Sequence, residues 1–169
     1  LLGPLTNPAN AKSQVMGVFD KKWLRPIAEV LKALGSEHVM VVHSQDGLDE
    51  ISLAAATDVA ELKNGEIREY QISPEDFGIP TQSVAPLQAQ DAEQSLALIK
   101  SALEGKGEVN PARDIVALNA GAAIYVCGVA DSLAEGVTIA EDVIGSGMAK
   151  IKMSELASFT RCFMDNESL

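Results

Sequence analysis

An unbroken apolar run in the first third of the chain constrains its fold more than any other feature. Residues 39–42 are Val-Met-Val-Val, which includes three β-branched side chains and no polar residue. Because side chains alternate between the two faces of a strand, such a run predicts a strand that is buried on both faces. Helical patterns lie on either side of it along the chain. This alternation predicts an α/β fold with a central, largely parallel or mixed sheet flanked by helices.

Turn and cap signals predict the elements around this strand. Residues 1–19 are expected to form a loop, because they contain two prolines whose preceding residues avoid helix. A helix is predicted from Asp20 to Leu34, with Pro26 kinking it or delaying its start. Residues 58–72 predict a hairpin around Asn64-Gly65.

The second half of the chain is predicted to be mostly helical. A cap at Asp91 predicts a helix that stops near Gly105, and Asn110-Pro111 predicts a second helix through Val126. A third helix is expected to begin at Asp131 or Ser132. The last predicted helix spans residues 148–163.

The charge balance limits the classes of partner. The sequence has 13 basic and 24 acidic residues, a formal net charge of -11. Such a surface repels nucleic acid and anionic lipid, so neither a nucleic-acid nor a membrane partner is expected. Cys127 and Cys162 are too few for a disulfide scaffold or a zinc cluster, and are expected to be reduced, buried thiols of a cytoplasmic protein. The chain starts without Met and is expected to be a piece of a longer protein.

The segment from His43 to Glu50 contains three carboxylates directly after the predicted strand. In open α/β sheets, ligands bind at the carboxyl ends of strands. The adjacent acids Asp49 and Glu50 can both turn toward Mg²⁺, which accepts one or two carboxylates together with water and phosphate oxygens. The same residues fit an ordinary turn, with Asp49 as a helix cap. The residue types alone leave both interpretations open.

Two motifs favour the metal interpretation. Residues 3–9, GPLTNPA, and residues 46–50, DGLDE, resemble the anthranilate phosphoribosyltransferase family. Softer matches follow at Asn119–Ala123, Glu135-Gly136 and Ser146-Gly147. The resemblance extends from Leu1 to about Phe159.

The resemblance implies a specific reaction. Enzymes of this family transfer the phosphoribosyl group of phosphoribosyl pyrophosphate (PRPP) to the amino group of anthranilate, giving phosphoribosylanthranilate and pyrophosphate in tryptophan biosynthesis. Catalysis then depends on aligning two substrates and neutralising the leaving pyrophosphate, without a covalent enzyme intermediate. The resemblance implies that Asp49 and Glu50 bind Mg²⁺, and that the complete protein is a cytoplasmic homodimer. The implied fold is the large domain of the nucleoside phosphorylase and phosphoribosyltransferase type, incomplete here.

The chain also departs from the family pattern. Ser44 stands where the family usually has Gly, Ala89-Gln90 where it often has Gly-Gly, and Ser95 where it often has Asn. The family's Gly-rich phosphate loop, its Lys-His-Gly-Asn segment, its anthranilate-facing Arg and its amino-terminal helical domain are all expected upstream of Leu1. Residues 1–169 are therefore expected to be the carboxyl-terminal part of the α/β domain, without a catalytic residue of its own and inactive alone.

Neighbouring residues are assigned lesser roles. Asp46 is expected to shape the turn with Gly47, with an outer-shell role toward the metal as a second interpretation. His43 is expected to be a neutral, hydrogen-bonded structural residue. Thr6 and Asn7 are expected to fix the opening loop through their side chains.

Two other functions share parts of this pattern. Pyrimidine nucleoside phosphorylases have the same architecture and also break a ribosyl bond, but they are not known for the acidic pair. A nucleic-acid-binding relative would need a basic face, which a net charge of -11 argues against. An inert folded piece of the enzyme is compatible with the first interpretation.

Overall fold

Four strands form one mixed sheet in the computed structural model, which describes residues 2–6, 9–104 and 110–164. The strands are β1 (Ser13–Gly17), β2 (His38–Ser44), β3 (Thr57–Lys63) and β4 (Glu66–Ile72). They are arranged in the order β1-β2-β3-β4, with β1 and β2 parallel and the other neighbours antiparallel. The predicted α/β class is confirmed, with a sheet of the mixed kind.

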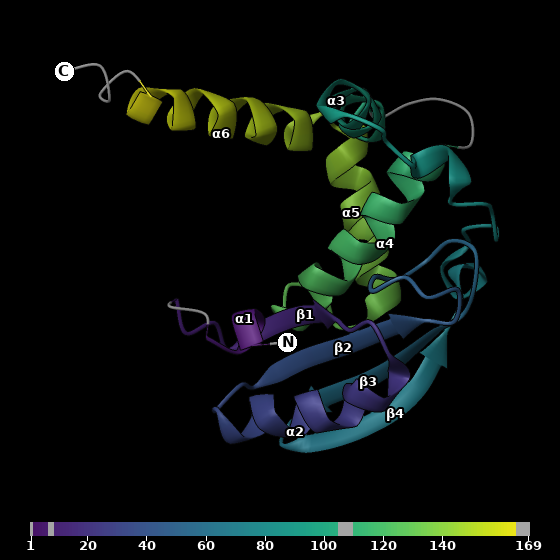
Figure 1. Cartoon of the computed structure of the whole chain (residues 1–169), viewed down its shortest axis with the longest axis vertical. Coiled ribbons are helices and arrows are strands. Elements are labelled where there is room, and N and C mark those ends of the chain that lie inside the picture. Colours follow the sequence, from purple (N-terminus) through teal and green to yellow (C-terminus); the bar gives the residue numbers. More distant parts are fainter. Residues whose placement is uncertain (1, 7–8, 105–109, 165–169) are drawn as a thin grey trace.

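Helices cover both faces of the sheet (Figure 1). The helices among the described residues are α1 (Leu2–Leu5), α2 (Leu24–Ala33), α3 (Ala92–Ala102), α4 (Pro111–Val126), α5 (Leu133–Gly145) and α6 (Met148–Met164), with short 3-10 turns at Lys21–Trp23, Pro74–Phe77 and Ala85–Leu87. α2 packs on one face, and α4, with α5 beside it, packs on the other. α6 extends away from the rest of the chain (Figure 1).

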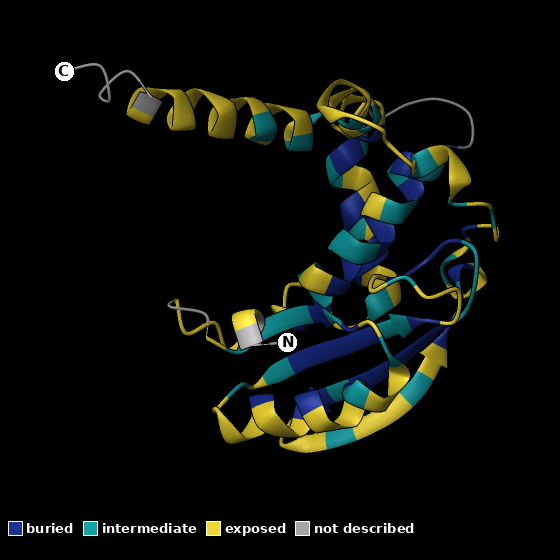
Figure 2. Cartoon of the chain, in the orientation of Figure 1, coloured by how far each residue is buried: buried dark blue, intermediate teal, exposed yellow. Residues whose placement is uncertain are grey.

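Strand β2 lies at the centre of the core. Residues 39–42 are all fully buried, at 0% exposure, and β2 is among the darkest segments in Figure 2. Val39 and Val41 join the cluster that packs against α2, whereas Met40 and Val42 join the cluster that includes α4 side chains. Full burial of one such side chain stabilises a fold by about 1.5–3 kcal/mol. The prediction of a strand buried on both faces is confirmed.

The local turn and cap predictions also agree with the structure. Asn64 and Gly65 both have positive φ, 53° and 77°, as a tight turn between two antiparallel strands requires. Asp91 accepts a hydrogen bond from the Gln94 N–H at 2.8 Å, although α3 ends at Ala102 and the predicted stop near Gly105 lies outside the described residues.

The other helix starts follow their cap residues. Asn110 caps α4, accepting a hydrogen bond from the Ala112 N–H at 3.0 Å. Ser132, rather than Asp131, caps α5. Asp20 caps the short turn before α2, and Pro26 lies in the first turn of that helix, so the start is delayed to Leu24.

Two sequence predictions are wrong. Residues 1–19 do not form a loop throughout, because they contain α1 and strand β1. β1 is short and of mixed polarity, and its pairing with the distant strand β2 gives it its structure. Cys127 and Cys162 are both exposed rather than buried, because Cys127 follows the end of α4 and Cys162 lies on the outward-extending α6.

Candidate metal-binding site

The acidic pair lies where two parallel strands end. Asp49 and Glu50 belong to the loop of residues 45–56 between β2 and β3, and both residues are exposed. This loop passes over the last residue of β1, because a Cβ added to Gly17 would lie only 1.6 Å from the Asp49 carbonyl oxygen. The pair is thus placed at the carboxyl ends of β1 and β2, the edge at which such sheets bind ligands.

Asp46 shapes the turn that precedes the pair. Its Oδ1 accepts a hydrogen bond from the Leu48 N–H at 3.1 Å, and its Oδ2 accepts one from the Ser52 hydroxyl at 2.6 Å. Burial acts to raise the pKa of Asp46, but hydrogen bonds from Ser52, Ser44 and Leu48 outweigh it and hold this pKa below its ordinary value. The expected turn-shaping role is confirmed, and it leaves Asp46 ionised and already bonded.

Asn119 fixes the loop on the other side of the pair. Its side-chain Oδ1 accepts a hydrogen bond from the Ile51 N–H at 3.0 Å, and its Nδ2 donates to the Ile51 carbonyl at 2.9 Å. Ile51, which directly follows Glu50, is only 2% exposed and belongs to the core. The sequence offers Asn119 only as part of a soft helical motif, because this contact depends on how α4 packs.

The two carboxylates of the pair have no bonded partner in the described part of the chain. Within residues 2–6, 9–104 and 110–164, neither Asp49 nor Glu50 accepts a hydrogen bond or forms an ion pair through its side chain. Although Glu50 is exposed as a residue, partial burial of its carboxyl group raises its pKa, and the charge of Asp49 raises it further. A hard divalent cation would relieve this repulsion, so the donor set fits Mg²⁺.

The pair is not a complete coordination sphere. In the described part of the chain, no group of three or more His, Cys, Asp or Glu side chains is arranged to bind a metal ion. Mg²⁺ commonly takes one or two carboxylates and fills its other positions with water and substrate phosphates. The arrangement therefore suits a metal that is shared with a phosphorylated ligand.

Other polar residues at this edge have structural partners. His43 Nδ1 lies 2.8 Å from the Val18 carbonyl oxygen, which confirms a hydrogen-bonded structural role. Asp58 forms an ion pair with Lys21 at 2.8 Å. The Thr6 hydroxyl donates to the Gly3 carbonyl at 3.1 Å, as expected of a residue that fixes the opening loop, while Asn7 lies outside the described residues.

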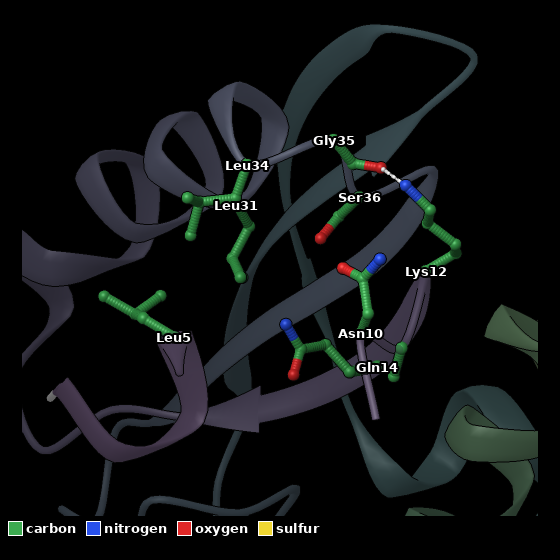
Figure 3. A pocket seen from close by; sticks show the side chains of 9 residues that line it. Leu5, Asn10, Lys12, Gln14, Leu31, Leu34, Gly35 and Ser36 are labelled. Carbon is green, nitrogen blue, oxygen red and sulfur yellow. Dashed lines mark hydrogen bonds between the residues drawn. The ribbon is translucent and has the colours of Figure 1, made fainter. Parts of the chain in front are cut away.

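A small pocket lies at the opposite end of β1. Residues at the start of β1 and the end of α2 line it, and the Lys12 ammonium donates to the Gly35 carbonyl at 2.9 Å (Figure 3). Its volume of about 40 Å³ suits a few water molecules at most. This pocket is too small for a substrate, whereas the acidic pair is exposed at the sheet edge.

The mixed α/β sheet and the acidic edge define the class of protein. Residues 1–150 match the family described as glycosyl transferase family, a/b domain, and the chain belongs to this family. Within it, the motifs around residues 3–9 and 46–50 resemble those of one group of relatives.

Relatives of high identity carry the name anthranilate phosphoribosyltransferase. The protein of Marinomonas sp. (strain MWYL1) is 80% identical over 169 residues, which cover 100% of this chain and 49% of the relative. The protein of Chromohalobacter salexigens is 61% identical over 161 residues, which cover 95% of this chain and 46% of the relative. The resemblance seen in the motifs is confirmed, and the chain spans about half the length of the relatives it matches.

Solved structures of the same enzyme share the fold. The crystal structure from Thermus thermophilus superposes with a TM-score of 0.85 at 39% identity, covering 95% of this chain and 46% of that one. The enzyme from Saccharomyces cerevisiae in complex with PRPP and Mg superposes with a TM-score of 0.75 at 26% identity, covering 86% of this chain and 42% of that one.

Proposed function

We propose that this chain is the carboxyl-terminal part of the α/β domain of an anthranilate phosphoribosyltransferase. The complete protein transfers the phosphoribosyl group of PRPP to anthranilate and releases pyrophosphate. The 80% identity over the whole chain supports this assignment. The structural observation that carries it is the pair Asp49 and Glu50, which lies at the carboxyl ends of β1 and β2 without partners in the described part of the chain.

In this proposal, Asp49 and Glu50 bind Mg²⁺. The metal neutralises charge that develops on the leaving pyrophosphate. The protein itself contributes the position of the two carboxylates, which Asp46 and Asn119 fix from either side. A cation at this edge would also offset the net charge of -11, which by itself disfavours a pyrophosphate group.

The remainder of the protein supplies what this half does not contain. We place the phosphate loop, the anthranilate-binding residues and an amino-terminal helical domain there, and we expect the complete protein to be a cytoplasmic homodimer. Five large apolar side chains of α6 are 56–62% exposed, which supports a covering segment from the rest of the polypeptide. They are Met148, Ile151, Leu156, Phe159 and Phe163. No helix among the described residues combines the length and apolar character needed to cross a membrane.

The decisive experiment follows the fluorescence of anthranilate in the presence of PRPP and a complete protein that contains this chain. We expect loss of fluorescence that requires Mg²⁺. Asp49→Asn and Glu50→Gln should each lower turnover by about 10²–10³-fold, the usual cost of removing one group that stabilises developing charge. Asp58→Asn is the matched control, because Asp58 lies at the same sheet edge but is paired with Lys21.

The outcomes separate the alternatives. No turnover by a folded, complete protein would overturn the assignment, and cleavage of a pyrimidine nucleoside with inorganic phosphate would then identify the nucleoside phosphorylase alternative. An equal loss in Asp58→Asn would show that the acidic pair has no special role.

A further inference from the structure

We infer that Asn119 of α4 is a positioning residue for the acidic pair. Its side-chain amide fixes the backbone next to Glu50, and so fixes the direction in which both carboxylates point. The inference rests on the proposed function, because it takes Asp49 and Glu50 as the metal ligands. Asn119 itself is not proposed as a ligand.

The Asn119 amide has one orientation that satisfies its hydrogen bonds. Its Oδ1 accepts from the Ile51 N–H, while Nδ2 donates both to the Ile51 carbonyl at 2.9 Å and to the Ile115 carbonyl, one helical turn earlier, at 3.0 Å. A flipped amide would set the oxygen against two carbonyls and the NH₂ group against an N–H donor. Both polar groups of this half-buried amide therefore have hydrogen-bond partners.

This contact lies directly beside the pair in the sequence, so it limits the movement of the backbone that carries the two carboxylates. Ile51 directly follows Glu50, and on the other side the Asp49 carbonyl lies against the backbone at Gly17. Glu50 is the one residue between these fixed points, and Asp49 itself carries the first of them. Without the Asn119 amide, the backbone N–H and carbonyl of Ile51 lose their partners on α4, and Glu50 loses its nearest fixed neighbour. Ligands that are less well oriented bind a metal more weakly.

Asn110 provides a matched comparison on the same helix. Its side chain accepts hydrogen bonds from the Ala112 and Arg113 N–H groups, so its removal weakens the start of α4. It lies nine residues before Asn119, which corresponds to about 13 Å along the helix axis. An effect that arises only from a less stable α4 would appear in both variants.

The experiment compares a complete protein that contains this chain with its Asn119→Ala variant, its Asn110→Ala variant and the double variant Asp49→Asn, Glu50→Gln. All are measured with PRPP present and anthranilate absent. Mn²⁺ serves as the probe, with its affinity measured by electron paramagnetic resonance, and NMR hydrogen exchange reports the Ile51 amide. For Asn119→Ala we expect faster exchange at Ile51 and Mn²⁺ binding weakened by about 10–100-fold, as for other residues that orient metal ligands. For Asn110→Ala we expect lower stability with unchanged affinity.

The other outcomes contradict either the role of Asn119 or the metal pair itself. Unchanged Mn²⁺ affinity in folded Asn119→Ala, or an equal loss in Asn110→Ala, would overturn the role of Asn119 and leave the metal pair intact. With PRPP present, Mn²⁺ binding that is absent from the parent protein, or unchanged in the double variant, would overturn the metal pair itself and with it this role. If Asn119→Ala does not fold, Asn119→Ser is tested in the same way, because its hydroxyl can still bond the Ile115 carbonyl but is too short for Ile51.

Discussion

At the residue scale, backbone contacts rather than side-chain contacts fix the position of the acidic pair. Because Gly17 has no side chain, the Asp49 carbonyl can lie against the end of β1. Asn119 forms hydrogen bonds with both the N–H and the carbonyl of Ile51. Partial burial of the Glu50 carboxyl group raises its pKa, and the neighbouring charge of Asp49 raises it further. The surrounding packing therefore holds two like charges next to each other, and a bound cation would offset them.

Gly17→Ala tests this packing directly. The added methyl group cannot coexist with the Asp49 carbonyl, so either the strand or the acidic loop must move. We expect a loss of about 1–3 kcal/mol in the free energy of unfolding, typical of overpacking, together with weaker metal binding. Urea denaturation measures the first effect. Gly3→Ala is the control, since nothing lies within 4 Å of its added Cβ, and an equal loss there would contradict the explanation.

At the element scale, the contact between α4 and α5 depends on two glycines. A Cβ added to Gly136 would lie 2.3 Å from the Gly121 carbonyl oxygen, and one added to Gly121 would lie 2.6 Å from the Val137 Cα. The two helices can approach this closely because both positions lack a side chain. Since α4 carries Asn119, this contact also affects the candidate site.

Gly136→Ala should therefore destabilise the fold although alanine favours helix. The gain in helix propensity is about 1 kcal/mol, and we expect the steric conflict to exceed it, for a net loss of about 1–2 kcal/mol. Thermal denaturation measures the difference. Thr138→Ala, on the exposed side of the same helix, should be neutral or slightly stabilising. A stabilised Gly136→Ala variant would show that the helices can move apart at little cost.

A polar cluster joins α4 to the sheet at the end remote from the acidic pair. The Glu61 carboxylate of β3 accepts hydrogen bonds from Tyr70 of β4 at 3.0 Å and from Tyr125 of α4 at 2.7 Å, and it lies 2.8 Å from His38 Nε2 of β2. Burial acts to raise the pKa of Glu61, but these hydrogen bonds outweigh it and lower this pKa.

The lowered pKa of Glu61 predicts an acid-sensitive stability. A group whose pKa is lower in the folded state stabilises the fold above its ordinary pKa of 4.5, and this stabilisation is lost as the pH falls through the folded value. Glu61→Gln should cost about 1–3 kcal/mol at pH 7, because partners are left unsatisfied, and should flatten the decline below pH 4.5. Urea titrations across this range measure both effects. Glu66→Gln, at an exposed site, should keep the parent dependence of stability on pH. The same dependence in Glu61→Gln would show that Glu61 is not the source of the acid sensitivity.

At the scale of the whole molecule, the proposed function makes this chain about half of a longer polypeptide. It spans 49% of the Marinomonas relative, and α6 presents a row of exposed apolar side chains. The superposition on the Thermus enzyme covers 95% of this chain and so leaves out about 8 residues, which is fewer than the 17 of α6. At least part of α6 therefore has its counterpart in a longer chain.

The 169-residue chain should not convert anthranilate when it is tested alone. It lacks the segments that we assign to PRPP and anthranilate binding, so positioning of the two substrates is not possible. The fluorescence assay with PRPP and Mg²⁺ measures this, with a complete protein as the positive control. Detectable turnover by the purified chain would show that the essential residues lie within these 169 positions.

The exposed face of α6 gives a second prediction at this scale. Phe159→Ser combined with Phe163→Ser should leave the stability of the isolated chain unchanged within about 0.5 kcal/mol, as is usual for exposed positions. In the complete protein the same change should cost at least about 3 kcal/mol, because both rings would leave a buried interface. Comparing the two unfolding free energies tests this, and equal small effects would show that nothing covers α6.

The sequence by itself determined the elements whose signals are local. The central strand at residues 39–42, the turn at Asn64-Gly65 and the caps Asp91 and Asn110 follow from hydrophobic pattern and side-chain chemistry within a few residues. The motif at residues 46–50 likewise locates the acidic pair. Resemblance, rather than residue type, was needed to prefer a metal site to an ordinary turn.

Only the tertiary structure decided the features that join distant segments. β1 exists as a strand because β2 pairs with it, Gly17 matters because the loop that holds Asp49 crosses it, and Asn119 bonds Ile51 because α4 packs over the sheet. Likewise, Cys162 is exposed because α6 extends outward. Such contacts depend on the packing of the whole chain, and no local pattern encodes a partner tens of residues away.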